Sequence, residues 1–371
     1  MTEVAIVGGG VVGTCVAYHL REAAADDELD VTLYEKSALG AETTSASMAL
    51  FMWQRDGPSD ADLRHRAWNE YRTLIERGTV TFERCGTLHV AETEAYLDAL
   101  EGTRAGLEAL GRDAEIVTPE AVEDLGLDPS AVVGGLYVPG SGYLDASEIV
   151  AHYADGAREA GVAVETGAEV TDVVVEGGAV AGVEVDGGRR DADVIVNAAG
   201  PWAVRLNELA GVSLPLRHTR GPILALEGEA PVRTPFARFE RGTYARPFDE
   251  SGLYVGHYAT EYDDADVVDP DEPRSLEDWF HAAARETVET FIPLFADARE
   301  VDAYVGLRTV TPDGRPAVGE TAVDGFLVAG GMTGQGVTLA PVVGQLVAER
   351  LENGTMPAEA EPFSPARFGG R

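Results

Sequence analysis

Three glycines and one glutamate near the start of the sequence have the types and spacing of a nucleotide-binding site. In "TEVAIVGGGVVG", Gly8, Gly10 and Gly13 form the pattern G-x-G-x-x-G. The first glycine allows a tight turn, the second lets backbone N–H groups approach a pyrophosphate, and the third lets a helix pack closely on a strand. Glu35 lies 22 residues after Gly13, where a carboxylate can accept both ribose hydroxyls of an adenosine. We expect these neighbours to contact the same nucleotide: Val11, Val12 and Lys36.

A second stretch, "GAETTSASMAL", is rich in hydroxyl groups and small residues. One interpretation is a loop that caps the following helix. The other is that Thr43, Thr44 and Ser45 bind further phosphate or ribityl oxygens, while the chain beyond them runs beside a flat ring. In that interpretation the residues beside the ring are Met48, Ala49 and Leu50.

A third stretch, "AGGMTGQGVTLAPVVG", is a second glycine-rich turn that leads into a helix. The amino end of a helix can stabilise the negative charge that develops at the N1–C2=O edge of a reduced flavin. Nicotinamide has no counterpart to this charge, so the stretch favours FAD, whereas the first glycine pattern fits NAD and FAD equally. The expected contacts are Gly331, Met332, Thr333, Gly334, Gln335, Gly336, Val337 and Thr338.

These residues need strands and helices that bring them together. Apolar runs predict buried strands over residues 4–7, 31–34 and 326–329, and helical spacing predicts helices over residues 12–22 and 337–351. Pro341 lies early in the second helix, where proline is tolerated. Strand–turn–helix units of this kind predict an α/β fold with a Rossmann-like domain.

Six motifs occur in the order seen in the D-amino-acid oxidase/glycine oxidase superfamily of FAD-dependent oxidoreductases, which the chain resembles over residues 4–351. They are "VAIVGGGVVG…VTLYEK", "GAETTSA", "VIVNAAGPWA", "YARPFDESGLYVG", "VGLRTVTPDGRPAVGE" and "AGGMTGQGVTLAPVVG". The resemblance implies an α+β protein overall, with a discontinuous FAD-binding domain over 1–85, 142–215 and 303–371. Strands alternating with helices predict a substrate domain, or lid, on a mostly antiparallel sheet over 86–141 and 216–302.

The resemblance assigns further residues. Val170 matches a valine that contacts the adenine, and the "NAAGPW" motif implies that Ala199, Gly200 and Trp202 lie beside FAD. Arg308 matches an arginine that pairs with the substrate carboxylate in amino-acid-oxidising members, and Tyr244 matches a tyrosine that closes over it. A planar guanidinium suits a carboxylate because it neutralises and orients it. The alternatives are a surface arginine and a core tyrosine.

The sequence also departs from the family. Glycine oxidase-like proteins have a second arginine where this chain has Gly334, which counts against glycine as the substrate. Sarcosine oxidases tether flavin to a cysteine where this chain has Leu307 and Arg308, so we expect non-covalent FAD. Those oxidases place a lysine over the flavin, whereas the single lysine here is Lys36. The final electron acceptor is therefore either oxygen or another molecule, and the missing lysine slightly favours an acceptor other than oxygen.

The expected function is oxidation of a small amine or amino acid, of the D-amino acid, glycine or N-methylglycine type, by hydride transfer to flavin N5 and hydrolysis of the resulting imine. Arg308 and Tyr244 would hold the carboxylate, and no side-chain base is required. One alternative is a 2-hydroxy-acid or polyol-phosphate dehydrogenase, which the same fold supports. Extra basic residues in the pocket would favour it, and Arg241 and Arg246 flank Tyr244 in the sequence. The other is a flavin-binding subunit or assembly factor without turnover of its own.

Charge and composition limit the partners. A formal net charge of −36 disfavours nucleic acid and anionic membranes, and a lysine-poor acidic surface indicates a protein of a salt-loving microbe. Two distant cysteines and the lack of a targeting segment or ~20-residue apolar run predict a cytoplasmic protein without a membrane span. No histidine has metal-ligand spacing, so no metal is expected. For His257 the alternatives are a side chain that faces the pocket and a structural histidine, of which we expect the second. The segment "TEYDDADVVDPDEPRSLEDW" is expected to be a solvated loop before a helix. A homo-oligomer is possible.

Overall fold

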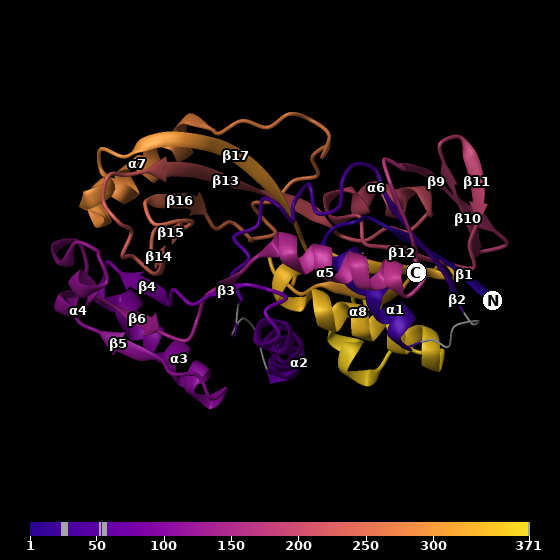
Figure 1. The fold of residues 1–371 in the computed structure, drawn as a ribbon, viewed down its shortest axis with the longest axis horizontal. Helices are drawn as coiled ribbons and strands as arrows, with labels where there is room; N and C mark the ends of the chain where they lie inside the picture. Colours follow the sequence, from indigo (N-terminus) through magenta and orange to yellow (C-terminus); the bar gives the residue numbers. More distant parts are fainter. Residues whose placement is uncertain (24–28, 52, 54–57, 370–371) are drawn as a thin grey trace.

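The computed structural model describes residues 1–23, 29–51, 53 and 58–369, and two large sheets organise the chain (Figure 1). The six-stranded sheet has the order β18 (Ala317–Glu320), β19 (Phe326–Gly330), β12 (Val194–Asn197), β1 (Thr2–Val7), β2 (Leu29–Glu35), β8 (Ala163–Thr166). All neighbours are parallel except β18 and β19. The carboxyl ends of β1, β2 and β12 lie together, since Val7 pairs with both Tyr34 and Asn197.

Both faces of this sheet are covered, because alternate residues of a strand point to opposite sides. On one side, Val4 and Ile6 pack in a core with helices α1 (Val11–Ala23), α2 (Pro58–Glu76), α5 (Ala146–Glu159) and α8 (Gly336–Asn353). On the other side, Ala5 and Val7 pack beneath α6 (Ala203–Leu209) and a small sheet of β9 (Val170–Glu176), β10 (Ala179–Val185) and β11 (Gly188–Asp191).

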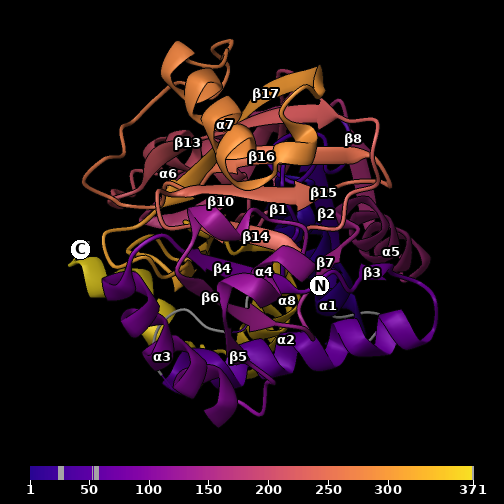
Figure 2. The same ribbon diagram turned by 90° about the vertical axis from the view of Figure 1, so that its left-hand side faces the viewer.

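The eight-stranded sheet has the order β17 (Arg299–Val310), β13 (Arg217–Glu227), β16 (Gly252–His257), β15 (Thr243–Pro247), β14 (Phe236–Phe239), β4 (Thr87–Ala91), β6 (Gly134–Val138), β5 (Glu115–Val117). Its neighbours are antiparallel except the parallel pair of β14 and β4. Helix α7 (Asp278–Phe291) packs on β13, β15 and β16, as Figure 2 shows from the side. The opposite face of the sheet carries a small aromatic cluster around Ile223, Phe236 and Tyr244.

Shorter elements connect the sheets. The remaining helices are α3 (Glu94–Ala109) and α4 (Pro119–Asp124), and strands β3 (Phe82–Glu83) and β7 (Tyr143–Leu144) pair with each other. Short 3₁₀ helices occur at η1 (Pro129–Ala131), η2 (Gly200–Trp202), η3 (Pro293–Phe295), η4 (Ala358–Phe363) and η5 (Pro365–Phe368). None of the described helices is long and apolar enough to cross a membrane.

The fold class is confirmed as mixed α/β, and the predicted strands and helices agree with β1, β2, β19, α1 and α8 to within a few residues. The division into two domains stays a prediction. Its boundary at residue 303 falls inside β17, which pairs with β13 along the eight-stranded sheet. Strand β17 is long, and it runs from the region of α7 toward the six-stranded sheet (Figure 1).

Candidate functional site

The first glycine turn is held by contacts that leave no room for side chains. Gly8 has a φ of +110°, and a Cβ there would lie 2.5 Å from the carbonyl oxygen of Ala198. A Cβ on Gly13 would lie 1.9 Å from the carbonyl oxygen of Gly8, so Gly13 lets α1 pack on the turn. Gly8 and Gly10 line a large cavity, whereas Gly13 does not. The roles expected of the first and third glycines therefore match the geometry.

Glu35 ends β2 at the edge of this cavity and fixes the turn. Its Oε2 accepts the backbone N–H of Gly9 at 2.7 Å, and its Oε1 accepts the N–H and the hydroxyl of Ser37 at 2.8 and 3.0 Å. Each carboxylate oxygen can accept more than one hydrogen bond. The carboxylate is therefore held in position and keeps capacity for a ligand hydroxyl.

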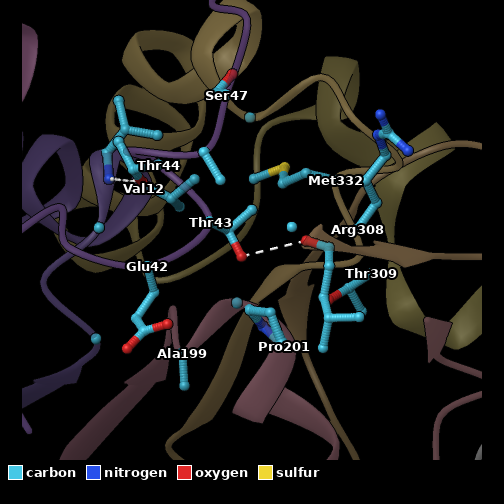
Figure 3. Close-up of a pocket in the computed structure, with 18 of the residues that line it drawn as sticks. Val12, Glu42, Thr43, Thr44, Ser47, Ala199, Pro201, Arg308, Thr309 and Met332 are labelled. Atoms are coloured by element: carbon cyan, nitrogen blue, oxygen red, sulfur yellow. Dashed lines mark hydrogen bonds between the residues drawn. The ribbon is translucent and has the colours of Figure 1, made fainter. Parts of the chain in front are cut away.

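Thr43, Thr44 and Ser47 of the hydroxyl-rich loop line the cavity (Figure 3). Thr44 Oγ1 accepts the N–H of Val11 at 3.1 Å, and Thr43 Oγ1 donates to the carbonyl of Leu307 at 3.2 Å. Ser45 was expected beside the ligand, but it does not line this cavity, because its hydroxyl donates back to the carbonyls of residues 41 and 42. Ser47 lines the cavity instead.

Two residues of the second glycine turn are supports and do not line the cavity. Thr333 is fully buried; its N–H donates to the carbonyl of Thr309 at 2.9 Å, and its hydroxyl donates to the carbonyl of Gly331 at 3.1 Å. Gln335 accepts from the buried guanidinium of Arg64 and donates to the carbonyl of Gly314 at 3.1 Å. The sequence identified this turn correctly but not the direction of these two side chains.

The remaining predicted residues all line one cavity, whose central part Figure 3 shows. They are Gly8, Gly10, Val11, Val12, Glu35, Lys36, Thr43, Thr44, Met48, Ala49, Leu50, Val170, Ala199, Gly200, Trp202, Tyr244, Arg308, Gly331, Met332, Gly334, Gly336, Val337 and Thr338.

The cavity fits FAD in its polar features. The amino ends of α1 and α8 both reach it, and neither helix has an acidic residue in its first turn. Two positive helix ends thus face a common space without a carboxylate of their own. A diphosphate at the first and the electron-rich edge of a flavin at the second are ligands that this arrangement would hold.

An acidic loop docks at the part of the cavity lined by Lys36, Trp202 and Arg205. Asp271 accepts from Lys36 Nζ at 2.8 Å, from Trp202 Nε1 at 2.9 Å and from Arg205 at 2.9 Å. The hydrogen bond from Lys36 is the main cause that lowers the pKa of Asp271 to about 2. Lys36 also lies 3.7 Å above the Trp202 ring. The segment expected to be a solvated loop is therefore anchored at this point.

Two glycines in the eight-stranded sheet let Arg308 and Tyr244 lie flat on its cavity face. The Arg308 guanidinium lies over Gly221, where a Cβ would come within 2.9 Å of it, and the Tyr244 ring lies over Gly256, where a Cβ would come within 2.3 Å. The guanidinium donates to the carbonyls of Arg220, His257 and residue 259 at 3.2–3.5 Å. Burial raises the pKa of Tyr244, although the charge of Arg308 opposes this.

Sequence reasoning missed several residues of this wall. Ile223, Phe236, Arg238 and Tyr258 all line the cavity around Tyr244. The alternation in "FARFERGTYARP" is the signal that could have found Arg238, because it pairs directly with Tyr244 across β14 and β15.

Three residues named as alternatives lie outside the cavity lining. Arg241 pairs with Glu92, and Arg246 is 9% exposed with its guanidinium 4.0 Å from the Tyr143 ring centre. His257 is half-buried, and burial lowers its pKa. Within the described ranges, no group of three or more His, Cys, Asp and Glu side chains is placed to hold a metal ion.

Comparison with known proteins gives relatives along the whole chain. Glycine oxidase of Geobacillus kaustophilus is 28% identical over 100% of this chain and 98% of its own. Dimethylglycine dehydrogenase of Homo sapiens is 28% identical over 99% of this chain, and 4-methylaminobutanoate oxidase of Paenarthrobacter nicotinovorans is 28% identical over 98%. This chain spans less than half the length of the last two, 44% and 45%.

Solved structures have the same fold. L-proline dehydrogenase from P. horikoshii superposes with a TM-score of 0.88 at 22% identity, covering 99% of this chain and 98% of that one. Glycine oxidase from Geobacillus kaustophilus superposes with a TM-score of 0.84 at 25% identity, covering 99% of both chains.

A family profile described as "FAD dependent oxidoreductase" matches residues 3–350. The family's name specifies its cofactor, which confirms the prediction of FAD over NAD. With the two glycine turns, the hydroxyl loop and the sheet wall converging on one cavity, the chain belongs to the DAO family of FAD-dependent oxidoreductases.

Proposed function

We propose that this protein oxidises a small amino acid or amine that bears a carboxylate, at its CH–NH₂ or CH–NH group. The observation that carries the proposal is that Arg308 and Tyr244 face the same cavity as the two glycine turns. FAD, when bound there, accepts the two electrons of the oxidation. The relatives include oxidases and dehydrogenases of such compounds, which supports the same class for this chain.

Arg308 is suited to bind the carboxylate. Besides a hydrogen bond with Tyr244, its partners are backbone carbonyls at 3.2–3.5 Å, longer than the 2.7–2.9 Å typical of a charge-assisted bond. A carboxylate would therefore replace weak hydrogen bonds with stronger ones. Tyr244 keeps its proton near neutral pH because burial raises its pKa, so its hydroxyl can donate to the same carboxylate.

The walls around these two groups are partly apolar and carry no acid on the sheet side. Ile223, Phe236, Met48 and Leu50 are the apolar part of the lining there. The acidic residues of the lining are Glu35, Glu42 and Glu169, and all three come from the dinucleotide-binding half. We therefore assign no side-chain base, and the amine would enter the reaction in its neutral form.

Three further proposals concern the cofactor and its surroundings. Non-covalent FAD is supported by the positions of Cys15 and Cys85, neither of which lines the cavity. A cytoplasmic location is supported by the fact that both cysteines are free. The final electron acceptor is oxygen or another molecule, and comparing the reduced protein's reoxidation in air with that by artificial acceptors would decide between them.

The test is anaerobic reduction of the purified holoprotein in high salt, followed by visible absorbance. The panel contains amino acids, N-methyl amino acids and 2-hydroxy acids, with Arg308→Met and the matched control Arg241→Met. We expect an amine to bleach the flavin in the wild type and in Arg241→Met, and to lose at least tenfold in rate at fixed low concentration in Arg308→Met. Bleaching by 2-hydroxy acids alone, or by no member of the panel, would overturn the proposal in favour of the dehydrogenase or the non-catalytic subunit.

A further inference from the structure

Arg238 is a second guanidinium on the wall that carries Arg308. It lies in β14, directly opposite Tyr244 of β15, and both side chains line the cavity. Its guanidinium carbon lies 4.6 Å from the centre of the Tyr258 ring, and that of Arg308 lies 5.6 Å from the same centre. The two positive groups therefore share one aromatic neighbour inside one cavity.

Arg238 has no anionic partner in the described part of the chain. Glu240, two residues further on, accepts from the N–H groups of Glu92 and Thr93 and from the hydroxyl of Thr93. Glu92 itself pairs with Arg241. The residue beside Arg238 on β4 is His89, and burial, together with the charge of Arg238, lowers the pKa of His89 to about 3, so this neighbour is neutral.

A third arginine adds positive charge on the same face of the sheet, beside the cavity lining. Arg246 lies two residues after Tyr244 in β15, so both side chains point to the same face. It is 9% exposed, and its Nε is buried without a hydrogen-bond partner in the described part of the chain. Its guanidinium carbon lies 4.0 Å from the centre of the Tyr143 ring and 5.2 Å from that of Tyr254. Asp145 interacts with this charge, since Arg246 is one of the causes that lower the pKa of the Asp145 carboxyl. The guanidinium nevertheless adds to the positive field at this wall.

From this arrangement we propose that the substrate carries a second anionic group, which Arg238 binds, so that the substrate class is a short acidic amino or imino acid with two carboxylates. The inference rests on the proposed function, with Arg308 and Tyr244 holding the carboxylate next to the reacting carbon. Arg238 then determines specificity by binding the distal carboxylate.

The spacing limits the length of that substrate. The guanidinium carbons of Arg238 and Arg308 lie 4.6 and 5.6 Å from the centre of the Tyr258 ring, so these two carbons are at most about 10 Å apart. A carboxylate carbon lies roughly 4 Å from the guanidinium carbon that it pairs with. A short diacid whose carboxylates approach both guanidinium groups from the cavity side, and not along the line between them, can therefore reach both, and succinate is a simple probe of this class.

The test compares two unreactive ligands of equal chain length, succinate and butyrate, by their perturbation of the flavin spectrum in the holoprotein. The variants are Arg238→Met, Arg308→Met and the matched control Arg241→Met, whose guanidinium pairs with Glu92 outside the cavity. We expect succinate to bind about ten to a hundred times more tightly than butyrate in the wild type and in Arg241→Met. In Arg238→Met the two ligands should bind equally, because the distal charge has lost its partner.

Equal binding of succinate and butyrate in the wild type overturns the inference, and so does a preference for succinate that survives in Arg238→Met. A parallel measurement of anaerobic flavin reduction should show kcat/KM higher for aspartate, glutamate or an imino diacid than for 2-aminobutyrate, and the reverse order also overturns it. Failure of the proposed function gives a different result from failure of this inference. If the proposed function is wrong, no amine reduces the flavin, but the ratio of succinate affinity to butyrate affinity still shows whether Arg238 binds a second carboxylate.

Discussion

Gly221 provides a test of the carboxylate site that changes neither Arg308 nor Tyr244. It lies within β13, where its neighbour across the ladder is Gly306 of β17. A Cβ at this position would lie 2.9 Å from Cζ and Nη1 of Arg308 and 3.0 Å from Nη2. Gly221 does not have a positive φ, so alanine fits the strand backbone, and the guanidinium at the end of a flexible side chain is the group that must move.

The size of the effect follows from these distances. Carbon atoms in contact prefer separations of about 3.5–4.0 Å, so Gly221→Ala displaces the guanidinium by roughly 0.6 Å or more. A hydrogen bond lengthened from about 2.9 Å by this amount is largely lost. Because a hydrogen bond to a charged group contributes about 1.5–3 kcal/mol, we expect a carboxylate ligand to bind about ten to a hundred times more weakly. The free energy of unfolding should change by less than about 1 kcal/mol, since alanine also reduces the entropy of the unfolded chain.

The assay is titration of the holoprotein with butyrate, followed by the flavin spectrum, together with thermal unfolding. Gly102→Ala is the matched control, because Gly102 lies in α3 with no atom within 4 Å of its added Cβ. The control should bind butyrate like the wild type. If Gly221→Ala also binds butyrate like the wild type while its flavin spectrum and Tm are unchanged, then the carboxylate does not lie against the guanidinium in the position seen here.

Three more measurements test other parts of the structure. Gly13→Ala places a Cβ 1.9 Å from the Gly8 carbonyl oxygen, so we expect loss of more than about 3 kcal/mol of stability and little bound FAD, measured by yield and flavin content. In the wild type both carboxylate oxygens of Glu35 accept hydrogen bonds from backbone N–H groups. Glu35→Gln replaces one of these oxygens with an NH₂ group that cannot accept, so the Kd for FAD should rise about tenfold in flavin-release assays. The pKa of Asp271 is about 2 in the folded protein, against the ordinary value of 3.8. The ionised carboxylate therefore stabilises the fold above pH 3.8, and this contribution is lost as the pH falls through 2. The difference in Tm between the wild type and Asp271→Asn should narrow over that range.

The sequence predicted the glycine turns well because their contacts are local or belong to a recurring unit. The contact of Gly13 with Gly8 spans one turn between a strand and a helix, and the position of Glu35 follows from the length of the strand–turn–helix–strand unit. Residue type and spacing are enough to identify such a site. They are not enough to orient every side chain within it, since the hydroxyl of Ser45 and the amide of Gln335 found protein partners away from the cavity.

The sheet wall could not be predicted in the same way, because its residues meet through pairing between distant strands. Arg238 lies beside Tyr244 only through the register of β14 on β15, and one residue of slip would turn both side chains to the other face. Tyr258 follows β16 and reaches both arginines only after β17, β13 and β16 have assembled. The resemblance to the family supplied Arg308 and Tyr244, but it carried no information on Arg238, which no motif of the family had marked.

The glycines of this wall explain how so much positive charge fits against a flat sheet. Gly221 and Gly256 leave space for the guanidinium of Arg308 and the ring of Tyr244, and Gly306 leaves space for Ala46 of the hydroxyl loop, whose Cβ would lie 3.1 Å from an added Cβ. The absence of side chains at these glycines therefore brings the proposed carboxylate-binding groups and the hydroxyl-rich loop to the same surface. In a strand, glycine normally weakens the sheet, so three of them on adjacent strands indicate that space for Arg308, Tyr244 and Ala46, and not the stability of the sheet, determines these positions.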